Sequence, residues 1–331
     1  MTAERGRESR KRTVSETLVG LDAIQQAHER VRPVVVRTPL YPADALQEGL
    51  GGEVRLKLES LQRAGSFKIR GAYNFVAQIP EQERARGIIT YSSGNHAQAV
   101  ALAARLHGIR AVVVMPVTAP EVKRKGAERL GAEVVLEGTT SLHRKLRAES
   151  IAEADGLAMV PPFDHPWIIA GAGTVGIEIA EDWDAFDTVL LPIGGGGLCS
   201  GSAAALRRLR PDVTILGVEP VGAASMRAAL DAGEPVTIES AESVADGLLP
   251  VRTGDLTFQH VREFVDDVVL VDDYAIREAA ALLFNRQRLV IEFSGAATVA
   301  ALRSGLTETR DRKTVAVVSG GNIDPSILAA L

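Results

Sequence analysis

Short runs of β-branched residues alternate with longer alanine-rich segments from about residue 85 to the C-terminus. The runs match strands that are buried on both faces, and the longer segments carry apolar residues at helical spacing. Strands that alternate with helices in this way form a parallel sheet with helices packed on both of its faces. The sequence therefore predicts the α/β class, and this alternation limits the possible architectures more than any other feature.

The predicted strands are Val54–Leu58, Gly87–Tyr91, Ala111–Met115, Glu133–Leu136, Thr188–Pro192, Thr214–Val218, Val268–Val271 and Thr314–Val318. The predicted helices are Asn95–Leu106, Gly173–Asp182, Leu198–Arg208, Asp273–Arg286 and Ala296–Ser304. Most of these strands end in a glycine, serine or proline loop. Open α/β sheets bind ligands at the carboxyl ends of their strands, so we expect the functional residues in these loops.

The composition limits the class of protein. A chain of 331 residues exceeds what one hydrophobic core usually serves, so two domains are expected. The net charge is −5 with acids and bases interspersed, which offers no basic footprint for nucleic acid. The single cysteine, Cys199, excludes an internal disulfide. Neither a membrane span nor a secretory signal is present, so we expect a cytoplasmic protein in which residues 1–13 form a disordered tail.

A glycine-rich loop follows the predicted strand Thr188–Pro192 and leads into a helix. Its residues are Gly194, Gly195, Gly196, Gly197 and Leu198. Glycines let successive backbone N–H groups point toward one centre, and a helix N-terminus adds positive potential, so a phosphate group fits there. The spacing differs from the dinucleotide fingerprint, and the lysine of a P-loop is missing. The alternative is a tight strand-to-helix turn without a ligand.

Lys68 lies between the apolar residues Phe67 and Ile69, after a glycine-containing turn. A lysine that is partly shielded from water loses its proton more easily and can act as a Schiff-base nucleophile. For an isolated lysine, a solvated position at a helix start is the better interpretation. Lys68 is therefore a candidate catalytic residue only in the context of the other loops.

Two further loops carry hydroxyl and amide side chains. The first ends one predicted strand and opens a helix with Ser92, Ser93, Gly94, Asn95 and His96. Hydroxyls and free helix N–H groups at one point suit a carboxylate, although serine and asparagine are also common helix caps. Ser319 follows the last predicted strand in a glycine-rich turn, which either has no ligand or holds the hydroxyl against a heterocycle.

Taken together and in this order, these segments resemble the fold-type II pyridoxal-phosphate enzymes, and among them the threonine/serine dehydratase and serine racemase family. The resemblance extends from about Thr38 to Asn322. It rests on LESLQRAGSFKIRGA, SSGNHAQA, TAPEVKRKGAERLGAEVV, PPFDHPWIIAGAGTVGIEI, PIGGGGL, GVEP, ADGL and SGGN. So many matching segments in register are not plausible by chance. The resemblance implies a fold like the β subunit of tryptophan synthase, with two open parallel-sheet domains and the active site in the cleft between them.

The same resemblance implies a domain division. Residues 1–84 and 166–331 form a large cofactor-binding domain, and residues 85–165 form a small domain. The sequence Pro161-Pro162 is compatible with the chain passing from one lobe to the other. Because the carboxylate loop lies on the small domain and the cofactor on the large one, we expect the lobes to close on substrate binding. A homodimer is also expected on this ground alone.

The implied cofactor is pyridoxal 5'-phosphate. Lys68 would hold it as a Schiff base, and Phe67 would pack beside its ring. Residues Gly194 through Leu198 would bind the phosphate through backbone amides, Asn95 would bond the phenolic oxygen, and Ser319 would meet the pyridine nitrogen. A serine in place of a carboxylate leaves that nitrogen largely unprotonated, and the weaker electron sink favours elimination.

The implied activity is the dehydration and deamination of a β-hydroxy amino acid, which belongs to amino-acid catabolism. The carboxylate of the small-molecule substrate would bind to Ser92, Asn95 and His96. The amine of Lys68, once displaced by the substrate amine, would act as the general base at the α-carbon. L-Threonine would give 2-oxobutanoate and ammonia, and L-serine would give pyruvate and ammonia.

Departures from the family pattern leave alternatives open. In the racemases the serine at the position of Ser93 is the base on the opposite face of the cofactor, whereas many threonine dehydratases have alanine there. Ser93 is therefore a second candidate catalytic residue, and a serine or aspartate racemase with side dehydratase activity is the alternative, unless Ser93 is only a helix cap. Pro250 and His143 differ from the racemases and argue against a dedicated racemase. They leave room for a larger substrate, such as a phenylserine or an intermediate of ectoine breakdown, and a catalytically silent relative is a further alternative.

The cation site of the family corresponds to Glu219, the carbonyl of Ala223, and Ser225, where aspartate is frequent. One carboxylate with neutral oxygens is a weak donor set for Mg²⁺ or Ca²⁺. The sequence therefore does not favour a bound divalent cation.

Overall fold

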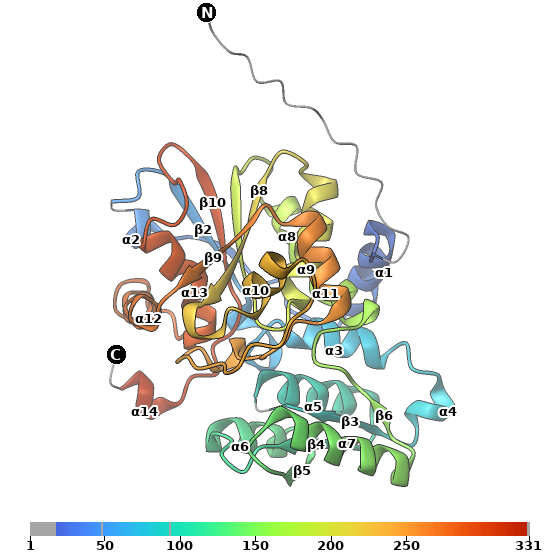
Figure 1. The fold of residues 1–331 in the computed structure, drawn as a ribbon. Coiled ribbons are helices and arrows are strands. Elements are labelled where there is room, and N and C mark those ends of the chain that lie inside the picture. The colour runs from blue at the N-terminus through green and yellow to red at the C-terminus, as the bar shows by residue number, and fades with distance from the viewer. Residues whose placement is uncertain (1–17, 48, 93, 330–331) are drawn as a thin grey trace, which may run out of the picture.

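The computed structural model describes residues 18–47, 49–92 and 94–329 and forms an α/β protein with two separate sheets (Figure 1). The larger sheet has the strand order β1-β2-β10-β7-β8-β9, and the smaller has the order β5-β4-β3-β6. All neighbouring strands are parallel except β1 and β2, which are antiparallel. The predicted fold class is confirmed.

The strands of the larger sheet are β1 (Leu40–Pro42), β2 (Glu53–Leu58), β7 (Thr188–Pro192), β8 (Thr214–Pro220), β9 (Asp267–Val271) and β10 (Lys313–Val318). Those of the smaller sheet are β3 (Ile88–Tyr91), β4 (Ala111–Met115), β5 (Glu133–Leu136) and β6 (Ala158–Met159). The α-helices are α1 (Leu21–Val31), α2 (Asp44–Gln47), α3 (Lys68–Val76), α4 (Glu81–Arg84), α5 (Asn95–His107), α6 (Glu121–Arg129), α7 (Ser141–Asp155), α8 (Pro166–Asp182), α9 (Gly197–Leu209), α10 (Ser225–Ala232), α11 (Asp255–Phe264), α12 (Asp273–Gln287), α13 (Phe293–Arg303) and α14 (Pro325–Leu328).

Helices cover both faces of each sheet, as the buried strand pattern requires. In β7, Val189 and Leu191 pack with residues of α8, α9 and α11, whereas Leu190 packs with residues of α12 and α13. In β4, Val113 packs with α3 and α5, whereas Val112 packs with α7. Strands buried on both sides explain why these segments are apolar without alternation.

The smaller sheet is built only from strands between residues 88 and 159, and it lies below the larger sheet in Figure 1. Pro161 and Pro162 follow β6, directly before α8 returns to the larger sheet. The helix α3 packs against both α5 and α8, so it connects the two layers. The division into two domains that close on each other stays a prediction.

The helix α8 begins at Pro166, so the predicted start at Gly173 is wrong. Glycine weakens a helix interior, which is why the glycine-rich first turns were not recognised as helical. The glycines are needed because α8 and α9 touch through their backbones. A Cβ atom on Gly201 would lie 2.1 Å from the carbonyl oxygen of Ile169, and one on Gly173 would lie 2.8 Å from the carbonyl oxygen of Gly201. The short strands β1 and β6 were also missed, because two or three residues carry no periodic pattern.

A buried cluster of charges joins β2, α3 and α8. The Arg70 guanidinium is fully buried and bonds both Glu59 and Glu178 with N–O distances from 2.7 to 2.9 Å. The Lys57 ammonium, also buried, lies 2.7 Å from Glu178 and donates to the carbonyl of Thr38 at 2.7 Å. Although burial raises the pKa of Glu59, the Arg70 and Lys57 charges outweigh it and hold that pKa below its usual range. The cluster fixes the first turn of α3.

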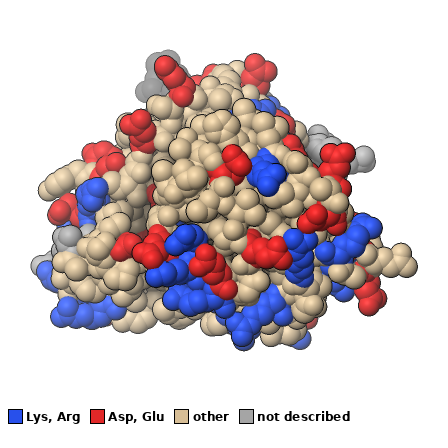
Figure 2. Space-filling model, turned by 90° about the horizontal axis from the view of Figure 1, so that it is seen from below, with Lys and Arg blue, Asp and Glu red and all other residues tan. Residues whose placement is uncertain are grey.

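Basic and acidic side chains are mixed on the face shown in Figure 2. Exposed Arg110, for example, pairs with both Glu133 and Asp155 at the edge of the smaller sheet. No helix in the described ranges is long and apolar enough to cross a membrane.

We predict that Arg70→Leu lowers the free energy of unfolding by about 3–5 kcal/mol, because it leaves the buried Glu59 without its ion-pair partner and leaves Glu178 with Lys57 alone. Equilibrium denaturation in urea measures this change. The matched control is Arg110→Leu, which removes an equally well-paired but exposed arginine and should cost far less. Equal losses in the two variants would contradict the role of the buried cluster.

Candidate active site

Loops from distant parts of the chain meet beside the start of α3. The N–H of Phe67 donates to the carbonyl of Ser319 at 3.2 Å, which places the residue before Lys68 against the loop that follows β10. In that loop the amide of Asn322 bonds the amide oxygen of Asn95 at 2.9 Å. The structure therefore brings together three of the loops that the sequence singled out, at the carboxyl ends of strands from both sheets.

The Lys68 amine donates to the carbonyl of Pro162 at 2.9 Å. No carboxylate in the described part of the chain forms an ion pair with it. Burial lowers the pKa of this amine to about 8, because desolvation disfavours the charged form and no nearby anion compensates. Lys68 is therefore much easier to deprotonate than a surface lysine.

The glycine loop connects β7 to α9, and the aromatic ring of Phe163 packs against it. A Cβ atom on Gly195 would lie 2.1 Å from the Phe163 ring, so only glycine fits there. Gly196 has φ +92°, a conformation that favours glycine. No side chain caps the N-terminus of α9, so its first N–H groups remain available to an anion.

Asn95 and His96 begin α5, and their side chains turn in different directions. The Asn95 amide donates to Glu292 and accepts from Asn322. The buried His96 ring places Nε2 3.3 Å from the carbonyl of Val160. Burial and the nearby Lys68 charge lower the pKa of His96 to about 3, so its ring is neutral and must donate from Nε2 to that carbonyl.

The other predicted site residues are placed as follows. The Ser92 hydroxyl accepts from the N–H of Gly94 at 3.2 Å. Ser93 lies outside the described residues. The Ser319 hydroxyl is buried, and its one contact, to the carbonyl of Ser294, is long at 3.5 Å. A buried hydroxyl with so weak a partner remains able to bond another group.

Glu219, the one carboxylate among the predicted cation ligands, caps the start of α10. The two carboxylate oxygens of Glu219 each accept a backbone N–H at 2.8 Å, from Met226 and Arg227 at the start of α10. Burial raises the pKa of Glu219 to about 7. The hydroxyl of Ser225 is buried without a hydrogen-bond partner in the described chain. No cluster of three or more His, Cys, Asp or Glu residues suited to a metal occurs within the described ranges, and cation binding here stays a prediction that the sequence does not favour.

Sequence reasoning missed Glu292, Lys123 and Phe163. Glu292 is a buried carboxylate beside Asn95, and Lys123 forms ion pairs with Glu292 and Asp246. The sequence did contain a hint for Lys123, because it lies three and four residues before Gly126 and Ala127 and so shares the buried face of α6 with them. A lysine on such a stripe needs a buried anion as its partner.

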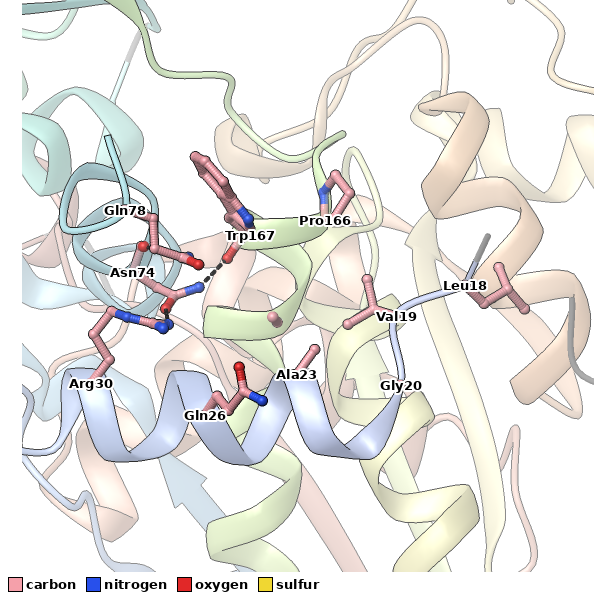
Figure 3. Close-up of a pocket in the computed structure, with 11 residues that line it drawn as sticks. Leu18, Val19, Gly20, Ala23, Gln26, Arg30, Asn74, Gln78, Pro166 and Trp167 are labelled. Carbon is pink, nitrogen blue, oxygen red and sulfur yellow. Dashed lines mark hydrogen bonds between the residues drawn. The ribbon is translucent and has the colours of Figure 1, made fainter. Parts of the chain in front are cut away.

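A separate cavity of about 290 Å³ lies between α1, α3 and the start of α8 (Figure 3). Its polar end is formed by Arg30, Asn74 and Gln78, where Arg30 donates to the Asn74 amide at 2.6 Å. None of the predicted cofactor or substrate residues lines it. This cavity is therefore not the predicted active site.

The model of the family described as "Pyridoxal-phosphate dependent enzyme" matches residues 31–320. The chain belongs to this family. The matched region includes Lys68, the glycine loop and Ser319. Pyridoxal phosphate is accordingly its cofactor.

Relatives with known names support a narrower placement. An L-threonine ammonia-lyase from Thermotoga maritima is 42% identical over 311 residues, which cover 94% of this chain and 77% of that protein. A catabolic L-threonine dehydratase from Escherichia coli is 40% identical over 310 residues, covering 93% of this chain and 94% of that protein. A solved serine racemase structure from maize has a TM-score of 0.91 and 36% identity, covering 94% of this chain and 96% of that chain.

The residues present fit the cofactor. The uncapped start of α9 suits a phosphate dianion, the Lys68 amine suits an aldehyde, and the Ser319 hydroxyl suits a neutral ring nitrogen. These three groups belong to α9, α3 and the loop after β10. The fit is chemical, and each residue's role remains a proposal.

We predict that Gly195→Ala weakens cofactor binding by about tenfold or more, as expected when one phosphate hydrogen bond is lost. The new methyl group displaces either the loop or the Phe163 ring. Titration of the apoenzyme with pyridoxal phosphate, followed by absorbance, gives the dissociation constant. Gly20→Ala is the control, because its Cβ would meet nothing within 4 Å. An unchanged constant in Gly195→Ala would exclude this loop as the phosphate site.

Proposed function

We propose that this protein is a catabolic L-threonine/L-serine ammonia-lyase. The observation that carries the proposal is the Lys68 amine, which has a lowered pKa and no carboxylate partner in the described chain. It donates to the carbonyl of Pro162, and the ring of the next residue, Phe163, packs on the glycine loop. The identities of 42% with an L-threonine ammonia-lyase and 40% with a catabolic L-threonine dehydratase, over more than nine-tenths of the chain, favour this activity within the family.

In this proposal Lys68 changes role during the reaction. Pyridoxal phosphate, when bound, supplies an electron sink for the charge that develops at the α-carbon. Lys68 would hold the cofactor and, once the substrate amine had taken its place, would be the group that moves the α-proton. A base with a pKa of about 8 is well matched to that task near neutral pH.

The substrate carboxylate would bind at the start of α5. Ser92 offers a hydroxyl, and among the described residues no side chain caps this helix, so its first N–H groups suit an anion. Because the neutral His96 ring already donates to Val160, we propose that His96 contributes its main-chain N–H and not its imidazole. The Asn95 side chain is likewise bonded to Glu292 and Asn322, so we propose that Asn95 binds the carboxylate through its main-chain N–H.

The net reaction balances without another reactant. Elimination removes water across the α and β carbons, and hydrolysis of the resulting imine returns that water and releases ammonia. L-Threonine gives 2-oxobutanoate, and L-serine gives pyruvate.

The remaining parts of the proposal concern the cofactor site and the assembly. Around the cofactor we keep the places proposed above for Phe67, Ser319 and residues Gly194 through Leu198. A homodimer and a cytoplasmic location belong to the proposal as well.

Racemisation is the second candidate function. It is favoured by the serine at position 93 and by the 36% identity to the maize serine racemase. Pro250 and Ser225 argue against a dedicated racemase. A larger β-hydroxy amino acid is an alternative substrate for the same elimination.

We expect borohydride reduction of the holoenzyme, followed by peptide mapping, to label Lys68 with the cofactor. Lys68→Ala should lose turnover of L-threonine by several orders of magnitude, because both the covalent link and the base are gone. Keto-acid release in a coupled assay measures the turnover. Labelling of any other lysine would overturn the assignment.

We expect incubations with L-threonine and L-serine to release ammonia and keto acid, with D-serine formed much more slowly than pyruvate. Chiral chromatography and the coupled assay provide the two rates. D-serine formation at a rate comparable to pyruvate would favour the racemase. Release of ammonia from a phenylserine alone would move the substrate to the larger class.

A further inference from the structure

Lys123 connects the smaller sheet to the larger one beside the site. It lies on α6, which follows β4, and its side chain is only 5% exposed. Its ammonium hydrogen-bonds Asp246, which precedes α11, and lies 3.6 Å from Glu292, which directly precedes α13. Both carboxylates belong to the segment that packs on the larger sheet. A buried cation from one layer is thus held by anions from the other.

Glu292 stands between this lysine and Asn95. Its side chain is buried, one of its oxygens accepts from the Asn95 amide nitrogen, and the other has the Lys123 ammonium as its neighbour. The neighbouring loop after β10 contributes Gly320, which carries no charge, and α5 contributes the neutral Asn95. Lys123 and Asp246 are therefore the titratable groups that face Glu292.

The surroundings fix which way the Asn95 amide points. Its oxygen accepts from Asn322, and the Asn322 nitrogen also donates to the carbonyl of Ala64 at 2.9 Å. The Asn95 nitrogen must therefore face Glu292, and one of its two hydrogens is left for another acceptor. An ionised Glu292 accepts only, so it holds this orientation, whereas a protonated carboxyl also offers a donor and leaves the amide free to turn over.

We propose that Lys123 is a positioning residue that favours the ionised form of Glu292 and thereby aims the Asn95 amide at the phenolic oxygen of the cofactor. The proposal rests on the role of Asn95 in the proposed function. It makes the cofactor site depend on a contact between α6 and the larger-sheet layer, and it adds a residue that the cofactor itself does not touch.

Removing the charge of Lys123 and removing the charge of Asp246 should shift the pKa of Glu292 in opposite directions. The pKa of Glu292 is raised above its usual value, because burial raises it more than Lys123 lowers it and Asp246 raises it further. Lys123→Met removes the opposing cation, so the pKa of Glu292 rises and the carboxyl is protonated over more of the working pH range. Asp246→Asn removes a like charge, so that pKa falls.

The experiment compares wild type, Lys123→Met, Lys123→Arg, Asp246→Asn and Lys125→Met. Lys125 is the control because it lies on the same helix, is 58% exposed and pairs with the exposed Glu121. Each holoenzyme is assayed for kcat/KM with L-threonine against pH. Each apoenzyme is titrated with pyridoxal phosphate, and thermal melting verifies that every variant is folded.

We expect Lys123→Met to move the acid limb of the pH profile to higher pH and to weaken pyridoxal-phosphate binding about fivefold to tenfold, as for one lost hydrogen bond. Asp246→Asn should move the limb to lower pH, Lys123→Arg should restore the wild-type position, and Lys125→Met should change neither quantity. Shifts of the same sign in Lys123→Met and Asp246→Asn, or no shift in a folded Lys123→Met, would overturn the proposal. If no amino acid is turned over but the binding constants change as expected, the proposed function fails and this inference stands.

Discussion

The buried pairing of Arg70 with Glu59 and Glu178 is the constraint on which the site depends. Lys68 precedes Arg70 by two residues, so the charge cluster and the reactive amine share one turn of α3. Together with Lys57, this makes two buried anions and two buried cations, and an arrangement that separated them would leave a buried charge unpaired. The cluster anchors the start of α3, while Lys68 bonds the carbonyl of Pro162, has no carboxylate partner in the described chain and keeps a lowered pKa.

The fold was predictable where local sequence decides the structure. The strands β4, β5 and β7 match their predicted bounds because consecutive β-branched residues end at clear turns. The helix α3 was not predicted, because Gly71 and the polar Asn74 obscure its apolar face. That face is decided by contacts with α5 and α8, which no window of sequence contains.

In the candidate site, too, residues in local motifs were predictable from the sequence, and residues defined by tertiary contacts were not. Lys68, Asn95 and the glycine loop lie in local motifs, so the sequence singled them out, and their predicted roles await the experiments. Glu292 and Lys123 were missed because their importance depends on the ion pair between them, and the two residues are far apart in the sequence. The neutral ring of His96 likewise follows from burial and from the carbonyl of Val160, not from any motif.

The backbone contact between α8 and α9 has a consequence for how this chain tolerates change. Where Gly173 and Gly201 meet, even the methyl group of alanine would collide with the backbone of the other helix. Neither position can therefore accept a larger residue unless the helices move apart. The backbones of the two helices lie in direct contact there, close to the N-terminus of α9 that leads out of the glycine loop. Mutational libraries aimed at new substrates should leave this pair of helices untouched and concentrate on the loops around it.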